Sequence, residues 1–82
     1  MSDAAAMNAL AQLVPVGSRV LDLGCGDGAF LQLLQQQRAC TGYGVELDDA
    51  NVLACARRGV SVLQLNLDQG LSLFGDNSFD VV

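Results

Sequence analysis

The sequence predicts an α/β fold, an open parallel β-sheet with flanking helices. Short apolar runs alternate with segments of helical periodicity, and a glycine-rich turn follows the first run. Strands that alternate with helices form parallel sheets through right-handed crossovers. The length of 82 residues suits one domain, and a hydrophobic content of 51% favours a packed core over disorder. We expect an N-terminal helix within residues 1–15 and a βαβαβ-loop-β unit over residues 16–82.

The first two elements are a short helix and a buried strand. A helix is predicted over residues 4–14, with Ser2 or Asp3 as its cap and Pro15 after its end. Its apolar side chains recur at helical spacing, and they are Leu10, Leu13 and Val14. Residues 19–23 (RVLDL) form a short apolar run that stops at glycine, which is typical of a buried strand.

The glycine turn at residues 24–28 leads into the second helix, expected over residues 29–37. The apolar side of this helix is formed by Phe30, Leu31, Leu33 and Leu34. Residues 41–47 form the second predicted strand, in which Tyr43 is expected to pack on a helix.

A third helix is predicted over residues 50–58, capped by Asp48 or Asp49 and ended by Gly59. Its last turn holds two arginines, which suit the negative end of the helix dipole. The third strand follows over residues 60–65.

The remaining residues predict a turn or short helical piece over 68–73 and a tight turn at 75–77. A fourth strand is then expected to begin over residues 78–82.

Composition excludes several classes of function. The net charge is −5, with no lysine and four arginines, so nucleic acids and anionic membrane surfaces would repel the chain. No apolar run approaches the ~20 residues of a membrane span, and the first residues lack the basic charge of a signal peptide. Three cysteines, no CxxC pair and no histidine argue against zinc and for a reducing compartment, with the cytoplasm as the expected location.

The sharpest functional feature is the segment VLDLGCGDG at residues 20–28. Gly24 and Gly26 let a ligand approach the bare backbone, and they also fit the looser form of the dinucleotide fingerprint. Asp22 and Asp27 flank the turn and would repel a pyrophosphate. S-adenosylmethionine (SAM) has no phosphate and carries a sulfonium and an ammonium group, so the acidic turn favours SAM over a nicotinamide or flavin dinucleotide.

Two further features lie at the same edge of the predicted sheet. Glu46 ends the second strand about 20 residues after the glycines, where an acidic residue can bind both ribose hydroxyls. Asn66 and Leu67 follow the third strand, where they can meet the edge and the face of an adenine. Ligands of open parallel sheets bind at this carboxyl edge.

Each of these residues also has a structural interpretation. Asp22 can close the turn with a bond to the backbone, and Asp27 is better explained as the N-cap of the next helix than as a ligand contact. Glu46 can be an ordinary charge at a strand end, and Asn66 is equally well a turn residue. Cys25 has no histidine to activate it and is best explained as a small residue in a tight turn. No catalytic residue and no metal ligand is predicted.

The motifs resemble a known superfamily. Residues 20–28 resemble motif I of class I SAM-dependent methyltransferases, and the ending SFDVV at residues 78–82 resembles a later landmark of the same enzymes. The methionine-biosynthesis MetW family is similar over roughly residues 16–82. That similarity is carried by GYGVELDDANV at 42–52, RGVSV at 58–62 and DQGL at 68–71.

The resemblance implies a partial Rossmann-like sheet, with strands 3, 2, 1 and part of 4 of the seven-strand order 3-2-1-4-5-7-6. It therefore covers only the N-terminal half of the superfamily fold, truncated after strand four. The implied cofactor-binding residues are Asp22, Gly24, Cys25 and Gly26 near the methionine end of SAM, Glu46 and Leu47 near the ribose, and Asn66 and Leu67 at the adenine. Where family members tend to have Gly-Asp, this chain has Leu65 and Asn66, which adds bulk at the adenine site.

The resemblance also implies a function. It predicts a bacterial-type protein linked to methionine biosynthesis that transfers a methyl group from SAM to an unknown acceptor, with this chain alone inactive. The alternative is a non-catalytic SAM-sensing partner that regulates a homoserine O-acyltransferase. An exposed fourth strand further predicts self-association through the sheet edge.

Overall fold

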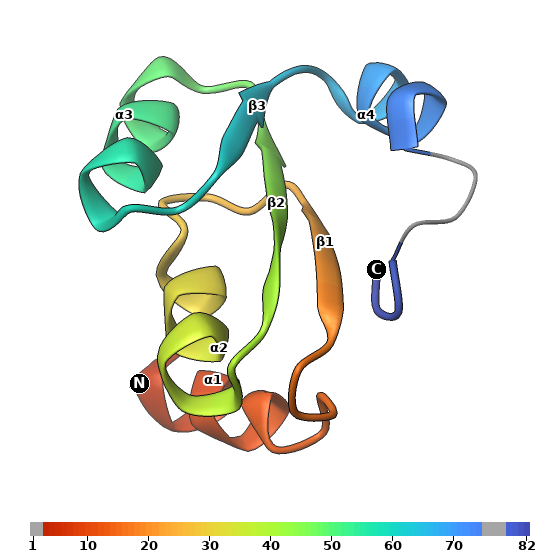
Figure 1. Ribbon diagram of the computed structural model, residues 1–82. Helices are drawn as coiled ribbons and strands as arrows, with labels where there is room; N and C mark the ends of the chain where they lie inside the picture. The colour runs from red at the N-terminus through yellow and green to blue at the C-terminus, as the bar shows by residue number, and fades with distance from the viewer. Residues whose placement is uncertain (1–2, 75–78) are drawn as a thin grey trace.

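The structure, a computed structural model, describes residues 3–74 and 79–82. Three parallel strands form a sheet in the order β1-β2-β3. The helices α1, α2 and α3 lie on one side of the sheet and α4 lies on the other (Figure 1). The strands are β1 (Arg19–Leu23), β2 (Thr41–Glu46) and β3 (Val62–Gln64), and the helices are α1 (Asp3–Ala11), α2 (Ala29–Arg38), α3 (Asp49–Arg58) and α4 (Leu67–Phe74). The predicted α/β class with a parallel sheet is confirmed.

The predicted fourth strand is reduced to a single parallel bridge between Val81 and Val20. Val81 therefore lies beside β1, on the edge away from β2, which is the position expected for strand four. Next to the bridge, Asp80 accepts the backbone N–H of Arg19 at 2.9 Å and its guanidinium at 3.1 Å. The predicted tight turn at 75–77 and the first residue of the predicted strand, Ser78, lie outside the described residues.

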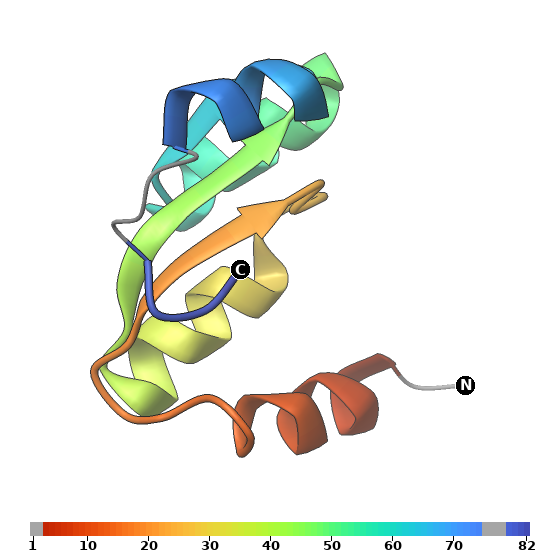
Figure 2. The same ribbon diagram turned by 90° about the vertical axis from the view of Figure 1, so that its right-hand side faces the viewer.

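The core between the sheet and α1–α3 is built from aliphatic and cysteine side chains. Its buried members are Ala11, Val14, Val20, Cys25, Leu31, Leu34, Cys40, Cys55 and Val60. Figure 2 views the sheet from the opposite, α4 side. On the α4 side of the sheet, Tyr43 stacks on Phe74 of α4 with ring centroids 5.7 Å apart, and Phe79 meets Phe74 edge-on at 5.4 Å. The expected packing of Tyr43 on a helix is confirmed.

The predicted apolar side of the first helix is confirmed for Val14 and wrong for Leu10 and Leu13. The helix ends at Ala11, and the side chains that reach the core are Ala11 and Val14. Leu10 and Leu13 are 53% and 78% exposed. After Ala11 the chain continues in a tighter turn, which directs Val14 inward and Leu13 outward. Arg38 fixes this turn by donating to the Val14 carbonyl over 3.0 and 2.9 Å.

Both predicted ends of the third helix are confirmed. Asp48 is the N-cap of α3, and its carboxylate accepts the backbone N–H of Asn51 at 3.0 Å. Gly59 is the C-cap, with a φ of 75°. Beyond it, β3 begins only at Val62, because the N–H of Val60 bonds to the Cys55 carbonyl and extends the helix cap. The segment predicted as a turn or short helical piece at 68–73 is the longer helix α4.

We expect the Asp48→Ala variant to lose about 1 kcal/mol of unfolding free energy, since it removes the carboxylate that satisfies the first turn of α3. The Asp48→Asn variant keeps an acceptor oxygen and should lose less. Urea denaturation followed by circular dichroism measures both. Equal loss in the two variants would show that the charge of Asp48, rather than its cap, stabilises the helix.

Two glycines of β2 lie where other parts of the chain approach it most closely, one beside β1 and one beside the glycine turn. A Cβ at Gly42 would stand 1.9 Å from the carbonyl oxygen of Val20 in β1, and the φ of Gly42 is 146°. A Cβ at Gly44 would stand 2.4 Å from the Sγ of Cys25 in the turn. Both positions therefore require glycine for β2 to pack as it does.

Over residues 3–74 and 79–82, none of the helices has the length and apolar character that crossing a membrane requires.

Candidate functional site

The glycine turn sits at the carboxyl ends of β1 and β2, as predicted. The N–H groups of Gly24 and Cys25 both bond to the Val45 carbonyl, at 2.7 and 3.1 Å. These bonds tie the start of the turn to the end of β2. Positive φ angles at Gly24 and Gly26, 75° and 59°, then reverse the chain toward α2. The turn thereby exposes backbone at the edge where ligands of open parallel sheets bind.

Glu46 joins the turn to the end of β2. One carboxylate oxygen accepts the N–H of Gly26 at 2.8 Å, and the other accepts those of Leu47 at 3.1 Å and Asp48 at 3.0 Å. The hydrogen bonds from the backbone of Asp48, and then those of Gly26 and Leu47, lower the pKa of Glu46, so the group is ionised at neutral pH. A carboxylate offers about four lone-pair sites, so about one remains for a ligand unless a bond is exchanged.

Asp22 lies half-buried near the end of β1, and burial raises the pKa of its carboxyl. Among the described residues, no hydrogen bond reaches this carboxylate, so the bond from Asp22 to the turn backbone is not formed. Burial also raises the pKa of the nearby Cys25 to about 12, with further contributions from Cys55 and from the charges of Asp22 and Glu46. Cys25 is therefore a protonated, inert thiol, and the field around the turn is negative.

Asn66 is the N-terminal residue of a capping box on α4. Its side-chain oxygen accepts the N–H of Gln69 at 2.8 Å, and the side-chain oxygen of Gln69 accepts the N–H of Asn66 at 3.0 Å. The structural interpretation of Asn66 is thus realised, while its amide nitrogen stays available to donate. Sequence reasoning missed Gln69, although Asn-x-x-Gln before an apolar run is a known helix-start signal.

A pocket of about 250 Å³ opens at this edge of the sheet. It is lined by Gly24, Val45, Glu46, Leu47, Leu65, Asn66 and Leu67. Three predicted site residues, Asp22, Cys25 and Gly26, do not line it, although Gly26 is bonded to Glu46. Ligand pockets commonly measure about 300–1,000 Å³, so this one accommodates part of a ligand. Leu65 contributes to the wall, which agrees with the bulk expected there.

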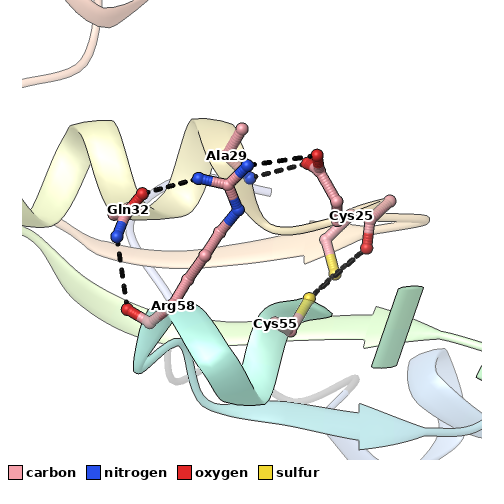
Figure 3. Close-up of polar contacts among 7 residues, drawn as sticks. Cys25, Ala29, Gln32, Cys55 and Arg58 are labelled. Carbon is pink, nitrogen blue, oxygen red and sulfur yellow. Dashed lines mark hydrogen bonds and ion pairs between the residues drawn. The ribbon is translucent and has the colours of Figure 1, made fainter. Parts of the chain in front are cut away.

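The prediction that Asp27 is the N-cap of α2 is wrong, because Asp27 lies one residue before the N-cap. The N-cap residue is Gly28, and Asp27 accepts the N–H of Ala29 at 3.0 Å. The second oxygen of Asp27 pairs with Arg58 of α3 at 3.3 Å (Figure 3). The bond from Ala29, followed by the charge of Arg58, lowers the pKa of Asp27. Asp27 thus serves the turn and the helix, and sequence reasoning missed its partner Arg58.

Solved structures of SAM-dependent methyltransferases share this fold. One from Archaeoglobus fulgidus is 26% identical, with a TM-score of 0.78 over 98% of this chain and 37% of its own. One from Thiobacillus denitrificans, in complex with S-adenosyl-L-homocysteine, is 26% identical, with a TM-score of 0.60 over 76% of this chain and 28% of its own. The chain therefore has the Rossmann-like fold of these methyltransferases. It spans little more than a third of the length of the Archaeoglobus fulgidus protein.

Sequence comparison identifies the family. A curated relative, the bifunctional methionine biosynthesis protein MetXA/MetW of Rhodopirellula baltica, is 39% identical over 79 residues. The match covers 87% of this chain and 13% of that protein. The family described as methionine biosynthesis protein MetW matches residues 4–82. The chain belongs to the MetW family of methionine biosynthesis proteins.

Proposed function

We propose that this chain carries the SAM-binding site of a methyltransferase that serves methionine biosynthesis. The observation that supports it best is Asp22, a half-buried carboxylate beside the glycine turn with no partner among the described residues. A buried charge without a partner is unfavourable, and a cationic ligand would supply the missing partner. The ammonium and sulfonium groups of SAM have the required charge, whereas a pyrophosphate has the opposite one.

The pocket would hold the nucleoside end of the cofactor. Glu46 would bind ribose hydroxyls by exchanging one of its three backbone bonds or by using its remaining lone pair. Leu47 and Leu67, 61% and 53% exposed at the rim, would become buried against the adenine, and the amide nitrogen of Asn66 would donate to it. SAM itself supplies the reactive methyl group, so these residues bind and orient rather than transfer protons. The methyl acceptor is left open.

Calorimetric titration of SAM and of NADH into the chain tests this proposal. We expect saturable binding of SAM and none of NADH. Stronger binding of NADH would instead support a dinucleotide site. No binding of SAM to a sample with the circular dichroism spectrum of an α/β fold would contradict the proposal for this chain.

The Asp22→Asn variant is expected to gain stability and to lose affinity for SAM. Because burial raises the pKa of Asp22, its ionised form disfavours folding once the pH exceeds the ordinary value of 3.8, and asparagine carries no such penalty. Loss of a charge-assisted contact should weaken SAM binding at least about tenfold. Urea denaturation and titration at pH 7 measure the two effects. The exposed Asp68→Asn is the control, and equal losses of affinity in both variants would contradict the assigned role.

A non-catalytic partner of a homoserine O-acyltransferase is the second candidate function. The observation that favours it is the R. baltica relative, whose name places MetXA and MetW in one bifunctional protein. Copurification of this chain with a homoserine O-acyltransferase, with and without SAM, tests it. A SAM-dependent complex without methyl transfer would support the regulator, and methyl transfer to a small acceptor without a complex would support the enzyme.

We also expect self-association through the sheet edges. Within the part of the chain that the structure describes, the outer edge of β1 pairs only through the bridge at Val81, and β3 is a short edge strand. Light scattering at increasing concentration should show species larger than the monomer, and a constant monomer mass would contradict this expectation.

The free, buried thiols of Cys25, Cys40 and Cys55 fit a reducing compartment such as the cytoplasm.

A further inference from the structure

The helix α3 supports the glycine turn from outside the pocket. Cys55 and Arg58 lie one helical turn apart on α3, and both side chains reach the turn or the start of α2 (Figure 3). Neither residue lines the pocket of the candidate site. Any influence they have on a ligand must therefore act through the turn.

Arg58 makes three polar contacts across this junction. Its guanidinium donates to the side-chain oxygen of Gln32 at 2.8 Å and to Asp27 at 3.3 Å. The side-chain nitrogen of Gln32 in turn donates to the Arg58 carbonyl at 3.3 Å. Arg58 thus joins the end of α3 to the first turn of α2 and to the last part of the glycine turn.

Cys55 acts on the same turn at Gly26. Its thiol donates to the Gly26 carbonyl at 3.3 Å, while the Gly26 N–H donates to Glu46 at 2.8 Å. Both backbone groups of Gly26 are therefore held, one by α3 and one by the end of β2. The packing is close, since a Cβ at Gly28 would stand 2.9 Å from the sulfur of Cys55.

The neighbouring arginine provides an internal comparison. Arg57 precedes Arg58 in the last turn of α3 and carries the same charge. The side chain of Arg57 is exposed and forms no hydrogen bond or ion pair within residues 3–74 and 79–82. The two residues thus share their charge and their helix, and they differ in contact with Gln32 and Asp27.

We propose that Arg58 is a positioning residue of the candidate cofactor site, which holds the glycine turn through Asp27 in the conformation that binds SAM. The inference rests on the proposed function. The turn contains Gly24, Gly26 and Gly28, all at positive φ, and such glycines lose much conformational freedom when they are fixed. A turn already fixed before the ligand arrives binds it more tightly. Without Arg58, the Asp27 side chain keeps backbone hydrogen bonds within the turn, above all from the Ala29 N–H, and loses its contact with α3.

The test compares Arg58→Gln with Arg57→Gln, two variants with the same change of charge. Amide hydrogen exchange of the ligand-free chain, followed by NMR, should show at least threefold faster exchange at Gly26 and Ala29 in Arg58→Gln. Arg57→Gln should match the original chain, and Arg58→Lys should fall between because it restores one donor to Asp27. In calorimetry, SAM affinity should fall about three- to fivefold in Arg58→Gln alone, the range for a partly exposed ion pair.

A double-mutant cycle separates positioning from a general loss of stability. If Arg58 acts through Asp27, then Asp27→Asn combined with Arg58→Gln should weaken SAM binding less than the two single effects multiplied. Equal exchange rates in Arg58→Gln and Arg57→Gln would overturn the proposal, as would faster exchange spread evenly over the sheet. Failure of the original chain to bind SAM would contradict the proposed function, whereas the exchange rates test the Arg58 contact in the absence of ligand.

Discussion

The Gly42→Ala variant is expected not to fold. The added methyl carbon would stand 1.9 Å from the Val20 carbonyl oxygen, which is backbone of the adjacent strand and cannot rotate away. The clash can be relieved only if β1 and β2 separate. These two strands form the longer of the two strand pairs in the sheet. At about 0.05–0.15 kcal/mol of stability per residue, a domain of 82 residues has about 4–12 kcal/mol, and small domains lie toward the lower value, where a loss of about 4 kcal/mol removes all of it. Thermal melting followed by circular dichroism should show no cooperative transition.

Gly17→Ala is the matched control for Gly42→Ala. Gly17 also has a positive φ, 77°, but a Cβ there would meet no atom within 4 Å. This variant should lose only about 1 kcal/mol, the conformational penalty alone. Similar melting temperatures for the two variants would show that the sheet can absorb the contact at Gly42.

The affinity of the Glu46→Ala variant for SAM is expected to be about tenfold to a hundredfold lower than that of the original chain. The substitution removes the acceptor for the N–H groups of Gly26, Leu47 and Asp48 together with the proposed ribose contact. Hydrogen bonds to a charged group contribute about 1.5–3 kcal/mol each when shielded, and the partial exposure of Glu46 places the effect near the lower end. Titration calorimetry with SAM measures the affinity.

Asp49→Ala is the control for Glu46→Ala, since it removes a carboxylate three residues further along the chain, at the start of α3. Asp49 bonds to Gln64 and does not line the pocket. Its removal should change SAM affinity less than threefold. If Glu46→Gln binds SAM as tightly as the original chain, the charge of Glu46 is unnecessary and its hydrogen bonds to the turn suffice.

Much of the fold was predictable because local signals and tertiary packing agree. The bounds of β1 and the caps of α3 follow from an apolar run that stops at glycine and from an aspartate and a glycine at the helix ends. The core-facing side of α1 was not predictable. Leu10 and Leu13 have the right helical spacing, but Ala11 and Val14 are the side chains that are buried. That choice depends on which helix packs opposite, which the local pattern does not contain.

The candidate site was predictable in position and less so in detail. Parallel strands bring the turn, Glu46 and Asn66 to one edge, and the pocket there includes Glu46 and Asn66 as expected. The hydrogen bonds of Glu46 to the turn and the contact of Arg58 with Asp27 join residues far apart in the chain. The first depends on how the end of β2 meets the turn and the second on how α3 packs against it, and no local spacing indicates either.

The contact between Gly44 and Cys25 limits how this family can diverge. Because a Cβ at position 44 would stand 2.4 Å from the Cys25 sulfur and 2.9 Å from its Cβ, the two positions share one small volume. A relative that gains alanine at position 44 must give up the side chain at position 25, so the pair should change together through descent. The residue at position 25 is then limited by the space that β2 leaves beside position 44. We expect its variation among relatives to follow packing rather than chemistry.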